Sequence, residues 1–301
     1  MNLWIPDQPG FEALGELPNG VVCRRYPLQG TLPPAILDAE LLVPSPHAPG
    51  VRELLPRMAA LRLLQTLSAG VDWLLPAPPG VKVCDARGAR DAAVAEWVLA
   101  AILSSTKRLG ELRDHQRAHR WQWIEPGDLA GSTVTILGYG SIGAAVQARL
   151  EPFEVSLIRV ARRARPGVHA VKELPELLAL TDVLVVLLPL TPATHRLLDA
   201  DMLTRLRPGA LLVNAARGAI LDTDALLELL HAGRLRAALD VTDPEPLAPE
   251  HPLWDAPGVL ITPHLAGDSP GAERRAFALV GEQVRRYVRG EPLANVVEGD
   301  Y

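Results

Sequence analysis

The chain has 301 residues, of which 48% are hydrophobic, and its formal net charge is −5. This length predicts two domains of ordinary size, each able to bury a core. The mild acidity argues against a nucleic acid or an anionic membrane surface as partner, because both require a basic face.

Two further features narrow the class of protein. The cysteines, Cys23 and Cys84, are far apart and fit no metal-ligand spacing, so we expect two buried, reduced thiols and no metal site. The first ten residues lack a basic start and a long apolar run, and no segment approaches the ~20 apolar residues that span a bilayer. We therefore expect a cytoplasmic protein without a membrane segment.

The first 80 residues alternate short apolar runs with proline-rich turns, which is typical of a small α/β unit. Buried strands are predicted at Leu41 to Val43 and at Leu63 to Leu67, and a helical stretch at Leu54 to Leu64. Asp91 is expected to cap a long helix from Ala92 to about Lys107, which is apolar on most sides and should be buried. A polar stretch, 108–128, follows this helix.

From Thr133 onward, predicted strands and helices alternate. The strands are expected at Thr133–Leu137, Val155–Val160, Val183–Leu188, Leu211–Asn214, Ala237–Val241 and Val259–Thr262. The helices are expected at Ser141–Glu151, Leu174–Ala179, Asp201–Arg207 and Asp224–Ala232. Most strands are apolar runs without alternation, as in parallel strands that are covered on both faces. The order predicts a doubly wound sheet of the Rossmann type.

The last segment, Pro270 to Tyr301, predicts an arginine-rich helix followed by an extended tail. Because this segment leaves the sheet domain, we expect it to return to the first domain. The sequence therefore predicts an α/β protein with a dinucleotide-binding domain at 91–267. A smaller, flavodoxin-like substrate-binding domain would be built from 1–90 and 268–301.

The stretch Gly138-Tyr139-Gly140-Ser141-Ile142-Gly143 has the G-x-G-x-x-G spacing of a dinucleotide-binding turn, between an apolar strand and an amphipathic helix. Gly138 permits the tight turn, Gly140 lets the backbone approach a pyrophosphate, and Gly143 lets the helix pack on the strand. The N–H groups of Ser141 and Ile142 would face the phosphates at the positive helix end. The alternative is a tight turn without a ligand.

The residues after the second strand of this domain concern the choice of cofactor. In NAD-binding folds an acid here accepts hydrogen bonds from the ribose hydroxyls. This chain instead has Ala161-Arg162-Arg163-Ala164-Arg165. Arginine binds a 2′-phosphate through charge-assisted hydrogen bonds. We therefore expect NADP to be preferred over NAD, with Arg162 and Arg163 binding the 2′-phosphate. The alternative is a solvated basic loop.

Three chemically active side chains follow neighbouring predicted strands. Arg217, Glu245 and His264 come after the fourth, fifth and sixth strands, at the sheet edge that also carries the glycine turn. A histidine can donate the proton that a carbonyl needs when it accepts hydride, and a carboxylate can orient its ring. An arginine can hold a substrate carboxylate. Each residue alone could be an ordinary surface group, so the prediction rests on their shared position.

The stretch from about Asp91 to Gly267 resembles the D-isomer-specific 2-hydroxyacid dehydrogenase family, which includes phosphoglycerate, glyoxylate/hydroxypyruvate and D-lactate-type dehydrogenases. The matching residues are Ala95-Glu96, the glycine turn, Leu188-Pro189-Leu190-Thr191 with Thr194, Asn214-Ala215-Ala216-Arg217-Gly218, Leu239-Asp240-Val241 with Glu245-Pro246, and Thr262-Pro263-His264-Leu265-Ala266-Gly267. Weaker matches lie at Ser68-Ala69-Gly70-Val71-Asp72 and at Gly290-Glu291-Pro292-Leu293 with Asn295-Val296-Val297.

This resemblance implies roles for the matched residues. Arg217 would bind the substrate, Glu245 would pair with the acid–base His264, and Asp240 would hold the nicotinamide carboxamide. The other implied contacts are with the cofactor for Pro189, Thr194, Ala215, Ala216 and Ala266, and with the substrate carboxylate for the backbone N–H groups of Ala69, Gly70 and Val71. The family also implies a homodimer formed through the cofactor domain.

Three positions depart from the family pattern. Ala161 stands where the acid is usual, Glu154 where glycine is common, and Thr242 where an aromatic residue is frequent. The first departure agrees with a preference for NADP. The second predicts a different local geometry, and the third a different packing on the substrate side.

The leading hypothesis is an NAD(P)-dependent reductase of a small 2-keto acid such as glyoxylate or hydroxypyruvate. One alternative is a dinucleotide-sensing binding protein of the same fold, similar to the corepressors of this superfamily. Another is a dehydrogenase of the same fold that acts on formate or phosphite. The residues do not decide which 2-keto acid would be the substrate.

Overall fold

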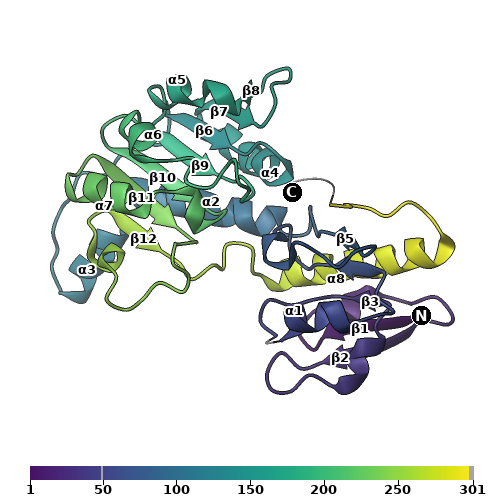
Figure 1. The fold of residues 1–301 in the computed structure, drawn as a ribbon. Helices are drawn as coiled ribbons and strands as arrows, with labels where there is room; N and C mark the ends of the chain where they lie inside the picture. The colour runs from purple at the N-terminus through teal and green to yellow at the C-terminus, as the bar shows by residue number, and fades with distance from the viewer. Residues whose placement is uncertain (49, 298–301) are drawn as a thin grey trace. The chain divides into compact units, whose positions relative to one another are not determined.

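The computed structural model describes residues 1–48 and 50–297, and the chain divides into two compact units (Figure 1). The terminal unit combines Met1–Asp91 with the segment from Asp268 onward, and the central unit is Ala92–Gly267. Both units are α/β with parallel sheets, which confirms the predicted fold class.

In the described part of the terminal unit, five parallel strands form one sheet in the order β2-β1-β3-β4-β5. The strands are β1 (Asn2–Pro6), β2 (Val22–Tyr26), β3 (Leu41–Leu42), β4 (Leu63–Gln65) and β5 (Lys82–Cys84). This order is the flavodoxin-like one, with the topological switch point between β1 and β3.

Both faces of the terminal sheet are buried. Leu3 and Ile5 of β1 pack on helix α8 (Pro270–Arg289), whereas Trp4 between them packs in a second core with α1 (Val51–Leu54). The alternation follows from the two-residue period of a strand. Helix α8 therefore returns the end of the chain to the first unit, as predicted, and covers one sheet face.

The structure corrects two expectations for the terminal unit. The helical stretch Leu54–Leu64 is limited to its first residues, because α1 ends at Leu54, a short 3₁₀ turn ends at Arg57, and Leu63 begins β4. Cys84 is buried as expected, but Cys23 is exposed. The cause is its place in β2, an edge strand paired only with β1, in which four of five residues are exposed.

In the described central unit, seven parallel strands have the order β12-β11-β10-β9-β6-β7-β8. The strands are β6 (Thr133–Leu137), β7 (Ser156–Ala161), β8 (His169–Ala170), β9 (Val183–Val186), β10 (Ala210–Asn214), β11 (Leu235–Leu239) and β12 (Val259–Ile261). The six predicted strands are confirmed within two residues, and only the two-residue edge strand β8 was not predicted.

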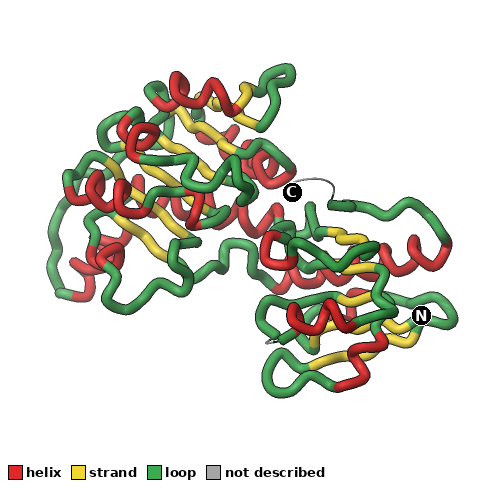
Figure 2. The backbone as a smooth tube through the Cα atoms, viewed as in Figure 1, coloured by secondary structure: helices red, strands yellow, loops and turns green. Residues whose placement is uncertain are grey.

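Helices cover both faces of this sheet (Figure 2). On one face lie α2 (Asp91–Thr106) and α4 (Ser141–Leu150), and on the other α5 (Leu174–Leu178), α6 (Ala200–Thr204) and α7 (Thr223–His231). The buried α2 was predicted, whereas the exposed helix α3 (Leu109–Arg117) was not. The chain adds strands outward from β6 on one side and from β9 on the other, so the strand order reverses between these two strands. This is the topological switch point at which ligands bind in such folds.

Candidate active site

The glycine turn joins β6 to α4 at the carboxyl end of the central sheet. Gly138 has φ +106°, and a Cβ there would lie 2.5 Å from the carbonyl carbon of Leu187. Any side chain would therefore collide with the backbone after β9. A Cβ on Gly140 would meet nothing within 4 Å, so this side of the turn is open. The turn leads directly into the amino-terminal end of α4, where the helix dipole is positive, and this is the kind of site that binds a pyrophosphate.

Tyr139 within the turn is held by residues that sequence reasoning had not assigned. Its hydroxyl donates to Gln147 Oε1 at 2.5 Å, and Arg159 Nε donates to the same oxygen at 2.6 Å. Arg165 Nη2 donates to the carbonyl oxygen of Tyr139 at 2.6 Å, and its guanidinium lies 5.6 Å from the ring centroid. Two arginines thus support the turn, one of them from the basic loop after β7.

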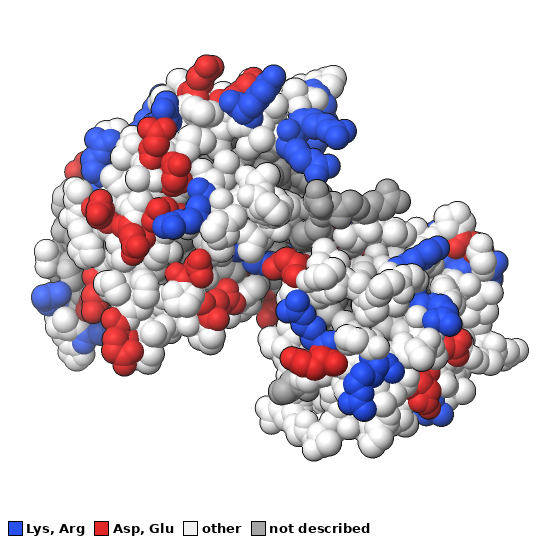
Figure 3. All heavy atoms as spheres, in the orientation of Figure 1, with Lys and Arg blue, Asp and Glu red and all other residues white. Residues whose placement is uncertain are grey.

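Arg162 and Arg163 follow the last residue of β7, Ala161, and both are exposed. Neither side chain forms a hydrogen bond or ion pair with any residue that the structure describes. Lys and Arg side chains gather over the β7 and β8 region of the central unit (Figure 3). This basic surface borders the strand end at which a ribose would lie in a Rossmann-type fold.

The loop after β9 is organised by one hydroxyl group. Thr194 Oγ1 donates to the carbonyl of Pro189 at 2.6 Å and accepts from Thr191 N at 2.8 Å. Thr194 therefore fixes the shape of the loop after β9 through its hydroxyl.

Arg217 is presented by a turn that Asn214 shapes. Asn214 ends β10 and is fully buried; its Oδ1 accepts from Ala216 N at 3.0 Å, and its Nδ2 donates to Arg217 O at 2.9 Å. A Cβ on Gly218 would lie 2.0 Å from the backbone of Thr242, so this glycine lets the loops after β10 and β11 pass closely. Asn214 is a positioning residue that sequence reasoning missed, although a polar residue closing an apolar strand was a visible signal.

Glu245 and His264 form a pair. His264 Nδ1 lies 2.5 Å from Glu245 Oε1, and both side chains are partly exposed at the carboxyl edge of the sheet. The loops that carry them follow β11 and β12, which are neighbours in the sheet. Because Nδ1 is engaged by the carboxylate, Nε2 is the ring nitrogen left to exchange a proton with a ligand.

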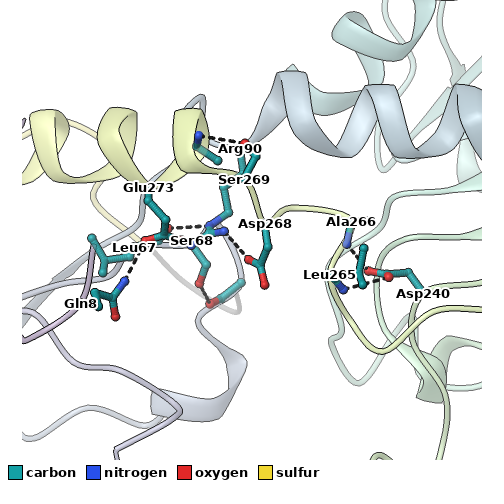
Figure 4. Close-up of polar contacts among 12 residues, drawn as sticks. Gln8, Leu67, Ser68, Arg90, Asp240, Leu265, Ala266, Asp268, Ser269 and Glu273 are labelled. Atoms are coloured by element: carbon teal, nitrogen blue, oxygen red, sulfur yellow. Dashed lines mark hydrogen bonds and ion pairs between the residues drawn. The ribbon is translucent and has the colours of Figure 1, made fainter. Parts of the chain in front are cut away.

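Asp240 follows β11 and is almost fully buried, with 2% of its surface exposed. Its carboxylate accepts hydrogen bonds from the backbone N–H groups of Leu265 and Ala266, at 2.9 and 2.8 Å (Figure 4). Thr262 Oγ1 donates to it at 2.6 Å. Asp240 therefore binds the loop that carries His264.

The predicted substrate loop belongs to the terminal unit and follows β4. Gly70 and Val71 donate their backbone N–H groups to no acceptor in the part of the chain that the structure describes. Arg90 Nε donates to the carbonyl of Leu67 at 2.8 Å and pairs with Asp268 and Glu273 (Figure 4). Arg90 thus ties the start of this loop to the first residues after Gly267.

Glu154 and Thr242, two of the positions that depart from the family pattern, each have a distinct local structure. Glu154 has φ +57°, a left-handed conformation that glycine adopts readily, so a residue with a side chain stands here in a backbone conformation that favours glycine. Thr242 Oγ1 donates to the carbonyl of Pro244 at 2.8 Å and stabilises the loop before Glu245.

Comparison with known proteins decides the family. The family model for the NAD binding domain of D-isomer specific 2-hydroxyacid dehydrogenases matches residues 99–266. The chain belongs to this family.

Relatives agree over most of the chain. A glyoxylate reductase from Thermofilum pendens is 31% identical over 85% of this chain and 76% of its own length. A D-3-phosphoglycerate dehydrogenase from Mycobacterium leprae is 32% identical over 88% of this chain, which spans 52% of that protein. The structure of an NADPH-dependent glyoxylate/hydroxypyruvate reductase from Sinorhizobium meliloti, in complex with NADP and sulfate, superposes with a TM-score of 0.84 at 28% identity, covering 99% of this chain and 98% of that one.

The chain spans only about half of some curated dehydrogenases of the family, such as the 52% of the M. leprae protein. Within the described residues no group of His, Cys, Asp and Glu side chains has the arrangement of a metal site. In the same residues no helix is both long enough and apolar enough to cross a bilayer.

Proposed function

We propose that the protein is an oxidoreductase that transfers hydride between NAD(P)H and the carbonyl carbon of a small 2-keto acid, of the glyoxylate or hydroxypyruvate type. The observation that carries this proposal is the His264–Glu245 pair at 2.5 Å. The two residues follow β12 and β11, and β11 pairs with β10, the strand before Arg217. A dinucleotide-sensing protein of the same fold can keep such a pair, so measured turnover is what separates the two functions.

Each of the matched residues would have a separate chemical role in the reaction. The bound nicotinamide would supply the hydride. His264 would donate a proton from Nε2 to the carbonyl oxygen as it becomes a hydroxyl, and Glu245 would orient the ring and stabilise its protonated form. Arg217 would bind the substrate carboxylate and polarise the carbonyl. In the terminal unit, the backbone N–H groups of Ala69, Gly70 and Val71 are the groups proposed to bind substrate.

The remaining matched residues would form the cofactor groove. The glycine turn would bind the pyrophosphate, and Arg162 and Arg163 would bind a 2′-phosphate and favour NADP. The other residues proposed to line the groove are Pro189, Thr194, Ala215, Ala216, Asp240 and Ala266. The S. meliloti reductase with NADP bound is similar to this chain and supports the same choice.

The test is a panel of 2-keto acids, assayed with NADPH and with NADH, in the unmodified protein and in His264→Asn. Asparagine keeps a polar group beside Glu245 but cannot donate a proton in the reaction, so turnover should fall by about 10³-fold while NADPH binding persists. His231→Asn, at an exposed histidine at the end of α7, is the control and should leave turnover unchanged.

Unchanged turnover in His264→Asn would refute the role of this histidine. Turnover of formate or phosphite, with none of any 2-keto acid, would point to the other dehydrogenase class. Tight binding of NADPH without turnover of any substrate would favour the sensing protein.

We further infer that the protein is a homodimer formed through the central unit. Helix α3 buries none of its residues, and the segment after it leaves Trp121 and Trp123 largely exposed. Leu109 and Leu112 of α3 are exposed as well. Exposed tryptophans with neighbouring leucines are typical of a protein interface, and a second copy is the occupant that the family implies.

A further inference from the structure

His264 has an unusual backbone for a residue with a side chain. Its φ is +53°, in the left-handed region that L residues other than glycine rarely adopt. The strained residue is the one proposed to exchange the proton. Such a conformation persists only where neighbouring groups over-determine it.

The groups that hold this conformation belong largely to Asp240. The N–H of His264 donates to the carbonyl oxygen of Asp240 at 2.7 Å, and the next two N–H groups, of Leu265 and Ala266, donate one each to the two carboxylate oxygens. Thr262, two residues before His264, donates its hydroxyl to the same carboxylate. One buried residue thus binds four of the five residues of the loop 262–266, and Figure 4 shows its contacts with Leu265 and Ala266.

We propose that Asp240 is a positioning residue for the reaction, which fixes the left-handed backbone of His264 so that its ring reaches Glu245. The proposal rests on the proposed function and adds to it, since it gives the Asp240 carboxylate a role that needs no contact with the cofactor. A carboxylate offers about four lone-pair sites, and three of them are already used by the loop.

The loop requires a carboxylate rather than an amide at this position. Each oxygen of Asp240 faces a backbone N–H, of Leu265 or of Ala266, and a backbone N–H can only donate. An asparagine has one oxygen and one NH₂ group, so in either orientation its NH₂ would oppose a donor. One of the two hydrogen bonds would be lost and replaced by repulsion, and the loop would move.

The first test is Asp240→Asn, with kcat, the KM for NADPH and the dissociation constant of NADPH measured separately. A displaced acid–base should lower kcat by about 10²-fold while NADPH binds within about threefold of the unmodified protein. If instead the affinity for NADPH falls and kcat at saturation is retained, Asp240 acts only through the cofactor and the proposal is overturned.

A second pair of variants tests the same loop without changing Asp240. Thr262→Val removes one donor to the carboxylate and should lower kcat about fivefold, whereas Thr262→Ser keeps the hydroxyl and should restore it. Asp243→Asn makes the same chemical change at an exposed side chain three residues away and should have no effect. Equal kcat values in the Val and Ser variants would contradict the proposal.

Hydrogen exchange separates this proposal from the proposed function. In the unmodified protein the amides of Leu265 and Ala266 should be protected, and in Asp240→Asn their exchange should accelerate by at least tenfold with the remaining sheet unchanged. This readout does not depend on turnover, so it tests the positioning even in a protein that reduces no 2-keto acid. Unaltered protection in Asp240→Asn would overturn the proposal.

Discussion

Arg162 and Arg163 are two exposed cations without a partner in the described chain, placed directly after the strand that bears the ribose site in a dinucleotide fold. Arg165, from the same loop, is already bound to the glycine turn. The three arginines therefore differ in their contacts: Arg162 and Arg163 have all their donors available for a phosphate, whereas Arg165 already uses Nη2 to hold the glycine turn.

A double variant, Arg162→Ser with Arg163→Ser, tests their role. Loss of two charge-assisted contacts should lower kcat/KM for NADPH by about 10²-fold and leave kcat/KM for NADH nearly unchanged. Arg205→Ser, which removes an exposed arginine after α6, is the control. A clear preference of the unmodified protein for NADH would contradict the proposed role of both arginines.

At the residue scale, the sequence predicted the acid–base pair but not the groups that hold it. His264 and Glu245 were identified because histidine and glutamate follow adjacent strands, and the structure pairs them. Asn214 and Asp240 act on backbone groups of loops whose conformations are not periodic. Such contacts depend on the turn geometry, which a pattern of residue types does not encode.

At the element scale, strands were predicted where an uninterrupted apolar run marks them and missed where charged residues or a proline interrupt the run. All six apolar strands of the central unit were identified from their uninterrupted runs. Strand β2 has two arginines among its five residues, and β1 ends in proline, so neither has the expected pattern. Helix α3 was missed because it is short and mostly polar and buries none of its residues.

The contact of α8 with the start of the chain provides a test at this scale. A Cβ on Gly281 would lie 2.0 Å from the carbonyl oxygen of Leu14, which is backbone and cannot rotate away. Gly281→Ala should therefore lower the free energy of unfolding by about 3 kcal/mol, measured by urea denaturation. In the same helix, Gly271→Ala meets only the end of the Arg275 side chain and should change stability by less than about 1 kcal/mol. Equal effects of the two substitutions would show that the close approach does not matter.

At the scale of the whole molecule, the proposed dimer depends on the segment that follows α2. Trp121→Ser combined with Trp123→Ser should raise the dissociation constant of the dimer by more than about 10²-fold, because buried tryptophans dominate such interfaces. Sedimentation equilibrium measures this directly. Leu180→Ser, at another exposed apolar residue of the central unit, should leave the dimer intact. A monomeric unmodified protein would exclude the inference.

The terminal unit is assembled from both ends of the chain, and this has a consequence for its biosynthesis. Phe277, Val280 and Val284 of α8 have no exposed surface and complete the core that Leu3 and Leu63 begin. A ribosome that adds 5–20 residues per second needs roughly 10–40 s to proceed from the first strands to this helix. The central unit is continuous and can close its sheet during that time. Strands β1 to β5 are synthesised before α8, so one apolar face of their sheet stays uncovered until α8 emerges from the ribosome. We therefore expect the nascent amino-terminal segment to be the part of the protein that most needs a chaperone.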